Sequence, residues 1–178
     1  MTVMVALLRG VNVGGATRVP MADLRRVVGD AGYGDVRTYV NSGNVVLTTD
    51  ATDTEEVAAT LRAACAEAFA LGPDVVVRTR DELAGVLAAN PFLDRDPDPT
   101  HHHVMFLPGP GPAVRPQVDV VAPEDLAVAG RELFLFLPNG LGRSALADRL
   151  VRRGGPGGTV RNWRTVTTLA AMADELTA

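Results

Sequence analysis

Residues 5–15 read VALLRGVNVGG, an apolar run that ends abruptly in a turn rich in glycine and polar side chains. The apolar residues 3–8 are typical of a buried β-strand, because neither face of such a strand would carry a polar residue. The turn contributes Arg9, Gly10, Asn12, Gly14 and Gly15. A strand that ends in such residues forms a backbone-lined polar pocket, where proteins often hold ligands. This turn is the first candidate binding segment.

The elements after this turn alternate between helix and strand. We expect a helix from Pro20 to Gly32, strands at 36–40 and 45–49, a helix from Asp53 to Gly72 and a strand at 75–78. Proline suits the first turn of a helix and glycine its end, and Asp53 and Glu56 have the spacing of a capping box. Asn41, Ser42, Gly43 and Asn44 join the two middle strands as a hairpin. The order βαββαβ predicts a ferredoxin-like subdomain over residues 1–79.

This topology brings two polar loops together. The first and second strands of a βαββαβ unit run in the same direction, so the loop after each emerges at the same end of the sheet. Because the third strand pairs with the first, residues 10–15 should lie beside residues 41–44, on the order of 5–10 Å away. We therefore expect one combined candidate site from two separate segments.

Residues 80–178 predict a second, smaller α+β subdomain, packed with the first as one unit. We expect a helix at 79–89 with a Thr79/Glu82 capping box, strands at 102–107, 118–121, 126–128 and 132–137, and helices after Ser144 and Trp163. The helix after Ser144 should turn Leu146, Leu150 and Val151 inward. The sequence shows no internal repeat.

Composition excludes several classes of function. The chain of 178 residues has a net charge of −4, and all 17 of its basic residues are arginines. Without lysine, neither Schiff-base catalysis nor a phosphate-binding P-loop lysine is available. Cys65, the single cysteine, allows no intrachain disulfide and is expected to be a buried small hydrophobe. The first apolar run is too short for a signal peptide or membrane span, so we expect a cytoplasmic protein without membrane contact.

Five blocks of sequence carry a resemblance. They read ALLRGVNVGG, VPMADLR, VRTYVNSGNVV, LPNGLGRS and RNWRTVTTLA and extend from residue 6 to residue 170. In this order they resemble the uncharacterised bacterial domain-of-unknown-function family 1697. The resemblance implies a two-part α+β protein with a ferredoxin-like first half, and it implies no reaction. The motif positions here are Arg9, Gly10, Asn12, Gly14, Gly15, Ser42, Gly43, Asn44, Asn139, Gly140, Arg143, Ser144, Arg161, Asn162 and Trp163.

These positions suggest an anion-binding site. The segments around Gly15, Arg143 and Arg161 each precede a predicted helix, where free backbone N–H groups and the helix dipole favour an anion. Arginine adds paired donors that suit phosphate or carboxylate. We therefore expect a phosphate- or nucleotide-like ligand held by Arg9, Asn12, Asn44, Arg143 and Arg161, with the remaining motif residues around it. In the other interpretation the glycines permit turns, the asparagines cap them and the arginines form internal salt bridges.

Specific catalytic and cofactor motifs are missing. Ala16 and Thr17 stand where a P-loop needs lysine and a hydroxyl residue, and many relatives carry lysine or asparagine there. Neither Ser42 nor Ser144 lies in a GxSxG elbow, and the only histidines are clustered at 101–103. That cluster is more typical of a surface patch than of a functional metal site, because fixed carboxylates are needed to complete one. We expect no cofactor and no metal, and enzymatic activity stays undecided.

Two other classes of function stay open. Ferredoxin-like sheets also bind RNA, and arginines near Trp163 and Tyr39 could contact a single strand. The net negative charge and the lack of an aromatic pair on the first and third strands make nucleic acid the less favoured partner. A regulatory or protein-interaction module without chemistry is the third class, in which a sheet edge near residues 75–77 could form a homodimer.

Overall fold

The computed structural model describes residues 1–13, 18–151 and 155–177. Its contacts divide the chain into a first unit, Met1–Ala84 with Thr168–Ala178, and a second unit, Gly85–Thr167. The boundary lies five residues beyond the expected one, since the helix after the fourth strand begins in the first unit. The C-terminal segment, which the sequence analysis assigns to the second subdomain, groups with the first unit.

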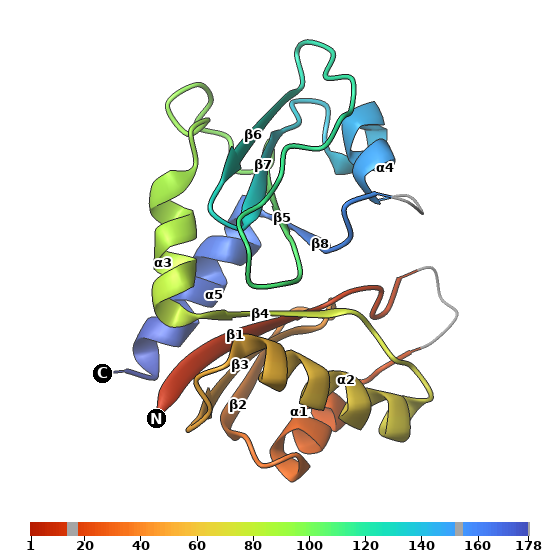
Figure 1. Ribbon diagram of the computed structural model, residues 1–178, viewed down its shortest axis with the longest axis vertical. Coiled ribbons are helices and arrows are strands. Elements are labelled where there is room, and N and C mark those ends of the chain that lie inside the picture. The colour runs from red at the N-terminus through yellow and green to blue at the C-terminus, as the bar shows by residue number, and fades with distance from the viewer. Residues whose placement is uncertain (14–17, 152–154, 178) are drawn as a thin grey trace. The chain divides into compact units, whose positions relative to one another are not determined.

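The first unit has the predicted ferredoxin-like topology. Its strands are β1 (Thr2–Leu8), β2 (Gly34–Tyr39), β3 (Asn44–Thr49) and β4 (Val75–Thr79). They form an antiparallel sheet in the order β2-β3-β1-β4, with Val5 of β1 opposite Val46 of β3 and Arg78 of β4. Helices α1 (Met21–Asp30) and α2 (Thr54–Phe69) cover one face of this sheet (Figure 1).

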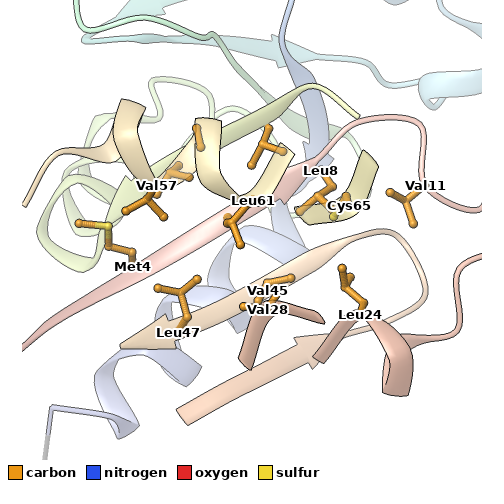
Figure 2. Close-up of a cluster of buried hydrophobic side chains, with 14 of the residues drawn as sticks. Met4, Leu8, Val11, Leu24, Val28, Val45, Leu47, Val57, Leu61 and Cys65 are labelled. Atoms are coloured by element: carbon orange, nitrogen blue, oxygen red, sulfur yellow. The ribbon is translucent and has the colours of Figure 1, made fainter. Parts of the chain in front are cut away.

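The core of the first unit lies between this sheet and its two helices. Met4 of β1 lies near Val57 of α2, and Leu8 of β1 lies near Cys65 of the same helix (Figure 2). The same core holds Cys65, which is 2% exposed, and burial raises the pKa of its thiol. The alternate residues Val3, Val5 and Leu7 are buried as well, as the wholly apolar strand predicts.

Helix boundaries follow local capping. The Asp53 carboxylate accepts hydrogen bonds from the backbone N–H groups of Glu55 (2.8 Å) and Glu56 (3.4 Å) at the start of α2. This helix ends earlier than the expected Gly72, because Ala70 adopts the left-handed conformation with a φ of 52°. The Thr79/Glu82 capping box is confirmed in both directions, at 2.8 and 3.1 Å, and begins helix α3 (Arg80–Ala89).

The second unit contains another antiparallel sheet. Its strands are β5 (His102–Phe106), β6 (Asp125–Ala129), β7 (Glu132–Phe136) and β8 (Thr159–Asn162). Helix α4 (Ala145–Val151), reached through a short 3₁₀ turn at Leu141–Arg143, packs against one face through Leu146 and Leu150. Helix α5 (Trp163–Glu175) follows β8 directly, and its residues from Thr168 onward belong to the first unit.

The two sheets have the same strand order. In β6-β7-β5-β8, as in β2-β3-β1-β4, the second, third, first and fourth strands lie side by side. In the second sheet residues 107–124 connect the first strand to the second without a helix, where α1 stands in the first sheet. Arg78 and Arg161 occupy matching register positions, opposite Val5 and Val104. No repeat in the sequence accompanies this structural repetition.

Two sequence expectations are wrong in the second unit. Residues 118–121 form no strand; they run as an irregular segment between Pro116 and Pro123, with Val118 and Val120 packed against the core. This run packs on the core without pairing to a strand of the sheet. Val151 does not point inward but is 38% exposed at the last position of α4.

Candidate functional site

The two polar loops of the first unit meet as the topology predicts. The side-chain amide of Asn12 donates a hydrogen bond to the carbonyl oxygen of Asn41 at 2.9 Å. The backbone N–H of Leu8 donates to the Gly43 carbonyl at 2.8 Å. A methyl group at Gly43 would lie 2.9 Å from Cβ of Leu8 and 3.1 Å from Cβ of Val11, so the hairpin backbone packs directly on the first loop.

Asn12 is fully used within the protein. Besides its bond to Asn41, its Nδ2 donates to the carbonyl oxygen of Val19 (2.9 Å) and its Oδ1 accepts from the N–H of Val19 (2.7 Å). These contacts join the two ends of the segment 12–19, which contains the predicted Gly14 and Gly15 and also Ala16 and Thr17; those four lie outside the described residues. A φ of 57° at Asn12 suits asparagine. The geometry therefore favours a structural role for Asn12 over a ligand contact. We call its three hydrogen bonds to Val19 and Asn41 the Asn12 clasp.

The hairpin residues differ in how far solvent reaches them. Asn44 is fully buried in β3, and its side chain donates to the carbonyl oxygen of Tyr39 at 3.1 Å. Ser42 is exposed at the tip of the hairpin, and Gly10 is exposed with a φ of 75° and open space around its Cα. Only the exposed members of this cluster are accessible to a solute.

Arg9 belongs to a charge cluster at the end of β1. Its guanidinium lies 3.8 Å from the Asp74 carboxylate, which also accepts a hydrogen bond from Arg62 at 2.5 Å. Asp74 thus faces two arginines, and its side chain is 55% exposed. Water and salt screen an exposed cluster of this kind, so the excess positive charge is a weak attraction for an anion.

In the second unit the segment Asn139–Ser144 connects β7 to α4. Gly140 has a φ of 80°, and Asn139 and Arg143 are exposed. The Ser144 hydroxyl is buried and accepts a hydrogen bond from the N–H of Ala147 at 2.9 Å, so it caps α4. Since α4 has only seven residues, the expected helix-dipole attraction for an anion has little support here.

An open groove of about 460 Å³ lies beside this segment. Its lining includes Leu141, Gly142, Arg143, Ala147, Val151 and Val160. Among the residues that the structure describes, the Arg143 side chain has no hydrogen-bond or ion-pair partner. Asp148, the acidic residue of the lining, takes part in another interaction. A partnerless guanidinium at the wall of a groove can bind a carboxylate or phosphate through two parallel hydrogen bonds.

The third motif segment is largely structural. Arg161 lies in β8, where its guanidinium donates to the Thr159 hydroxyl (2.5 Å) and to the Val160 carbonyl (2.9 Å). Burial lowers its pKa to about 10. Asn162 caps α5 by accepting from the N–H of Thr165 at 2.8 Å, and Trp163 is 8% exposed. Arg161 is therefore a strand residue that bonds back along its own strand, and not an exposed helix-start arginine.

The three clustered histidines lie in different environments. His101 precedes β5 and contacts the Asp96 carboxylate at 2.9 Å, and the His102 ring contacts the Asp96 carbonyl oxygen at 2.6 Å. His103 is 5% exposed and its Nδ1 has no partner in the described structure. Burial lowers the pKa of His103 to about 4. Within the described ranges no group of three histidine, cysteine or acidic residues has the geometry to hold a metal ion.

Sequence reasoning missed the apolar part of the groove. Leu141 and Val151 are 41% and 38% exposed, although helical periodicity places Val151 with the core residues. The only signal in the sequence is that Leu141 stands in a glycine-flanked turn ahead of the helix, where no core position is required.

Together, the two sheets of the same strand order, the loop closed by Asn12 and the groove beside Arg143 define a two-unit α+β protein. The chain belongs to the family described as Protein of unknown function (DUF1697), which matches residues 1–134. The groove residues 141–160 lie beyond the matched part. None of the curated proteins matches the chain.

A solved structure is similar in fold. It is that of the conserved bacterial protein SP0830 from Streptococcus pneumoniae, with a TM-score of 0.79 and 21% sequence identity. The similarity covers 98% of this chain and 99% of that one. At this identity the comparison shows the α+β fold. No helix in the described part of the chain combines the length and apolar character needed to cross a membrane.

Proposed function

We propose that this protein binds an anionic small molecule, and that Arg143 is the principal contact. One observation carries the proposal: the Arg143 guanidinium stands at the wall of a 460 Å³ groove and has no partner in the described structure. Small-molecule sites in proteins are concave and have volumes of about 300–1,000 Å³, so the groove has a suitable size. Arginine binds phosphate and carboxylate in a planar, two-pronged geometry.

The other motif residues support this proposal by elimination, because most of their side chains are already hydrogen-bonded within the protein. Asn12, Asn44, Ser144 and Asn162 spend their polar side-chain groups on backbone contacts, which leaves Arg143 as the motif arginine best placed for a solute. Arg9 shares Asp74 with Arg62 and is the weaker candidate. The sheet residues of β1 and β3 are buried apart from Thr2 and Thr49, so bases of RNA have little surface there on which to stack.

Thermal-shift and calorimetric titrations with inorganic phosphate, nucleotides, organic acids and short RNAs test the proposal. A ligand at about 100 times its dissociation constant raises the free energy of unfolding by about 2.7 kcal/mol. We expect such stabilisation in the wild type and its loss in Arg143→Ala. Arg164→Ala is the matched control, since Arg164 is an exposed α5 arginine outside the groove.

Three outcomes would overturn the proposal. Arg143→Ala could bind as tightly as the wild type, Arg9→Ala alone could abolish binding, or no anion could bind at all. Stabilisation by RNA that falls steeply with salt would instead support the nucleic-acid class of function.

A further inference from the structure

We infer that the ligand of the groove is amphiphilic: an anionic group that contacts Arg143, attached to an apolar body that lies on Leu141 and Val151. This inference rests on the proposed function and names the chemical class of its ligand. A phosphate ester or a carboxylic acid with an apolar chain has this chemistry.

The apolar body is inferred from the groove walls. Leu141 and Val151 are two of the eight large hydrophobic residues exposed among those described, and both line this groove. Val160 and the buried Ala147 extend the same lining, and Val160 also packs against the core. Scattered single hydrophobic residues need no explanation, but several that share one concave surface are typical of a ligand site.

The anionic group is inferred from charge. Arg143 is exposed, lines the groove and makes no side-chain hydrogen bond or ion pair with the described residues. The lining also contains one acidic residue, Asp148. The groove therefore presents the Arg143 guanidinium, without a partner among the described residues, next to apolar walls. This arrangement is complementary to an acid with an apolar tail and not to a neutral lipid or a sugar.

Apolar contact gives this inference a quantitative signature. Each buried methylene contributes about 0.8 kcal/mol, which corresponds to roughly a fourfold change in affinity. A chain that lies along Leu141 and Val151 should therefore bind on the order of tenfold more tightly for each two methylenes added, until the groove is filled. A ligand that contacts only Arg143 would show no such dependence.

The test titrates the full-length protein with butanoate, hexanoate and octanoate, and with inorganic phosphate and hexyl phosphate, using amide chemical shifts or calorimetry. We expect affinity to rise with chain length and hexyl phosphate to bind more tightly than phosphate. Leu141→Ser should flatten the dependence of affinity on chain length. It should leave phosphate binding within about twofold, because phosphate has no apolar chain and substitution of an exposed side chain has little effect on folding. Val114→Ser is the control, since Val114 is 80% exposed and outside the groove.

The outcomes separate this inference from the proposed function. Binding of phosphate and all acids with equal affinity, abolished by Arg143→Ala, would keep the anion site and overturn the amphiphilic ligand. A chain-length dependence that Leu141→Ser leaves unchanged would also overturn it, since the apolar body would then lie elsewhere. Absence of binding by every probe would overturn both.

Discussion

Asn12 and Arg143 are both polar motif residues, yet the structure uses them in opposite ways. The Asn12 amide makes three hydrogen bonds, two to Val19 and one to Asn41. The Arg143 guanidinium makes none with the described residues. A side chain whose donors and acceptors are satisfied has little to offer a ligand, whereas a free guanidinium does. Asn12 and Arg143 therefore differ in whether their polar atoms are available to a ligand. Residue type alone does not reveal this difference.

The role of Asn12 can be measured directly. Asn12→Ala removes three hydrogen bonds and places alanine at a φ of 57°, so we expect a loss of about 3 kcal/mol in the free energy of unfolding. Asn41→Ala is the control, because Asn41 contributes its backbone carbonyl to the clasp and its exposed side chain makes no hydrogen bond with the described residues. Urea unfolding of both variants decides the matter: equal stabilities would exclude the clasp.

Because His103 is buried, we expect the protein to lose stability in mild acid. Its pKa is lowered from 6.5 to about 4 by burial, so the unfolded chain takes up a proton more readily than the folded one. The native state is therefore fully favoured above about pH 6.5 and is destabilised as the pH falls toward about 4, by up to about 3 kcal/mol. The pKa values of Asp96 and Asp98 are lowered from 3.8, mainly by hydrogen bonds, so their protonation acts at lower pH.

Unfolding midpoints measured across this pH range check the assignment. His103→Leu should lose the fall in stability between about pH 6.5 and 4, because it removes the buried group that must stay neutral. His101→Gln keeps His103 and should retain the fall. The same pH profile in wild type and His103→Leu would show that another group is responsible.

Among the elements, the β2–β3 hairpin shows how close backbone contact fixes a loop. Gly43 and Gly10 both have positive φ, 71° and 75°, but only Gly43 faces other atoms, the Cβ atoms of Leu8 and Val11 at 2.9 and 3.1 Å. A substitution at Gly10 therefore tests only the conformational penalty of a left-handed residue. A substitution at Gly43 tests this penalty together with steric overlap with the adjacent loop.

Alanine substitutions at these glycines have different expected results. Gly10→Ala should lower the free energy of unfolding by about 1 kcal/mol, from conformation alone. Gly43→Ala should lower it by about 3 kcal/mol, because overpacking adds to the same penalty. Chemical denaturation of the two variants gives the difference. If Gly10→Ala lowered the free energy of unfolding by as much as Gly43→Ala, the contact of Gly43 with Leu8 and Val11 would not account for the cost.

Sequence predicts those elements whose signals are local. The capping residues Asp53 and Thr79 place α2 and α3, and the fully apolar run at 3–8 identifies β1. The strand expected at residues 118–121 is wrong, because an apolar alternating run does not reveal whether a partner strand is available. The groove escapes prediction for the same kind of reason: the exposure of Leu141 and Val151 depends on tertiary packing. Local chemistry predicts elements better than it predicts surfaces.

At the scale of the whole molecule, strand order repeats while sequence does not. Both sheets place their first strand between the third and fourth, and in each the fourth strand ends in an arginine and a helix-capping residue: Arg78 and Thr79 in β4, Arg161 and Asn162 in β8. A helix is present in one first connection and absent from the other. Since sheet topology tolerates many apolar sequences, the repetition is visible only in the structure.

The first unit is also discontinuous in the chain, since residues 168–178 join residues 1–84. Two ion pairs within this unit tie its segments together: Arg80 donates to Asp174 at 2.6 Å, and Arg37 donates to Glu175 at 2.8 Å. The hydrogen bond and charge of Asp174 raise the pKa of Arg80. The C-terminal end of α5 is thus anchored by electrostatic contacts as well as by its buried residues Leu169 and Ala173.

A double-mutant cycle on Arg80 and Asp174 tests whether this anchor matters to the fold. We expect Arg80→Ala and Asp174→Ala each to destabilise the protein slightly, with the double variant less destabilised than the sum, because each single change already removes the pair. Both side chains are well exposed, so the coupling should shrink in about 1 M salt, where screening acts within about 3 Å. Arg37→Ala with Glu175→Ala is the parallel cycle at the neighbouring pair. Additive effects in both cycles would mean that apolar burial alone holds the C-terminal segment on the first unit.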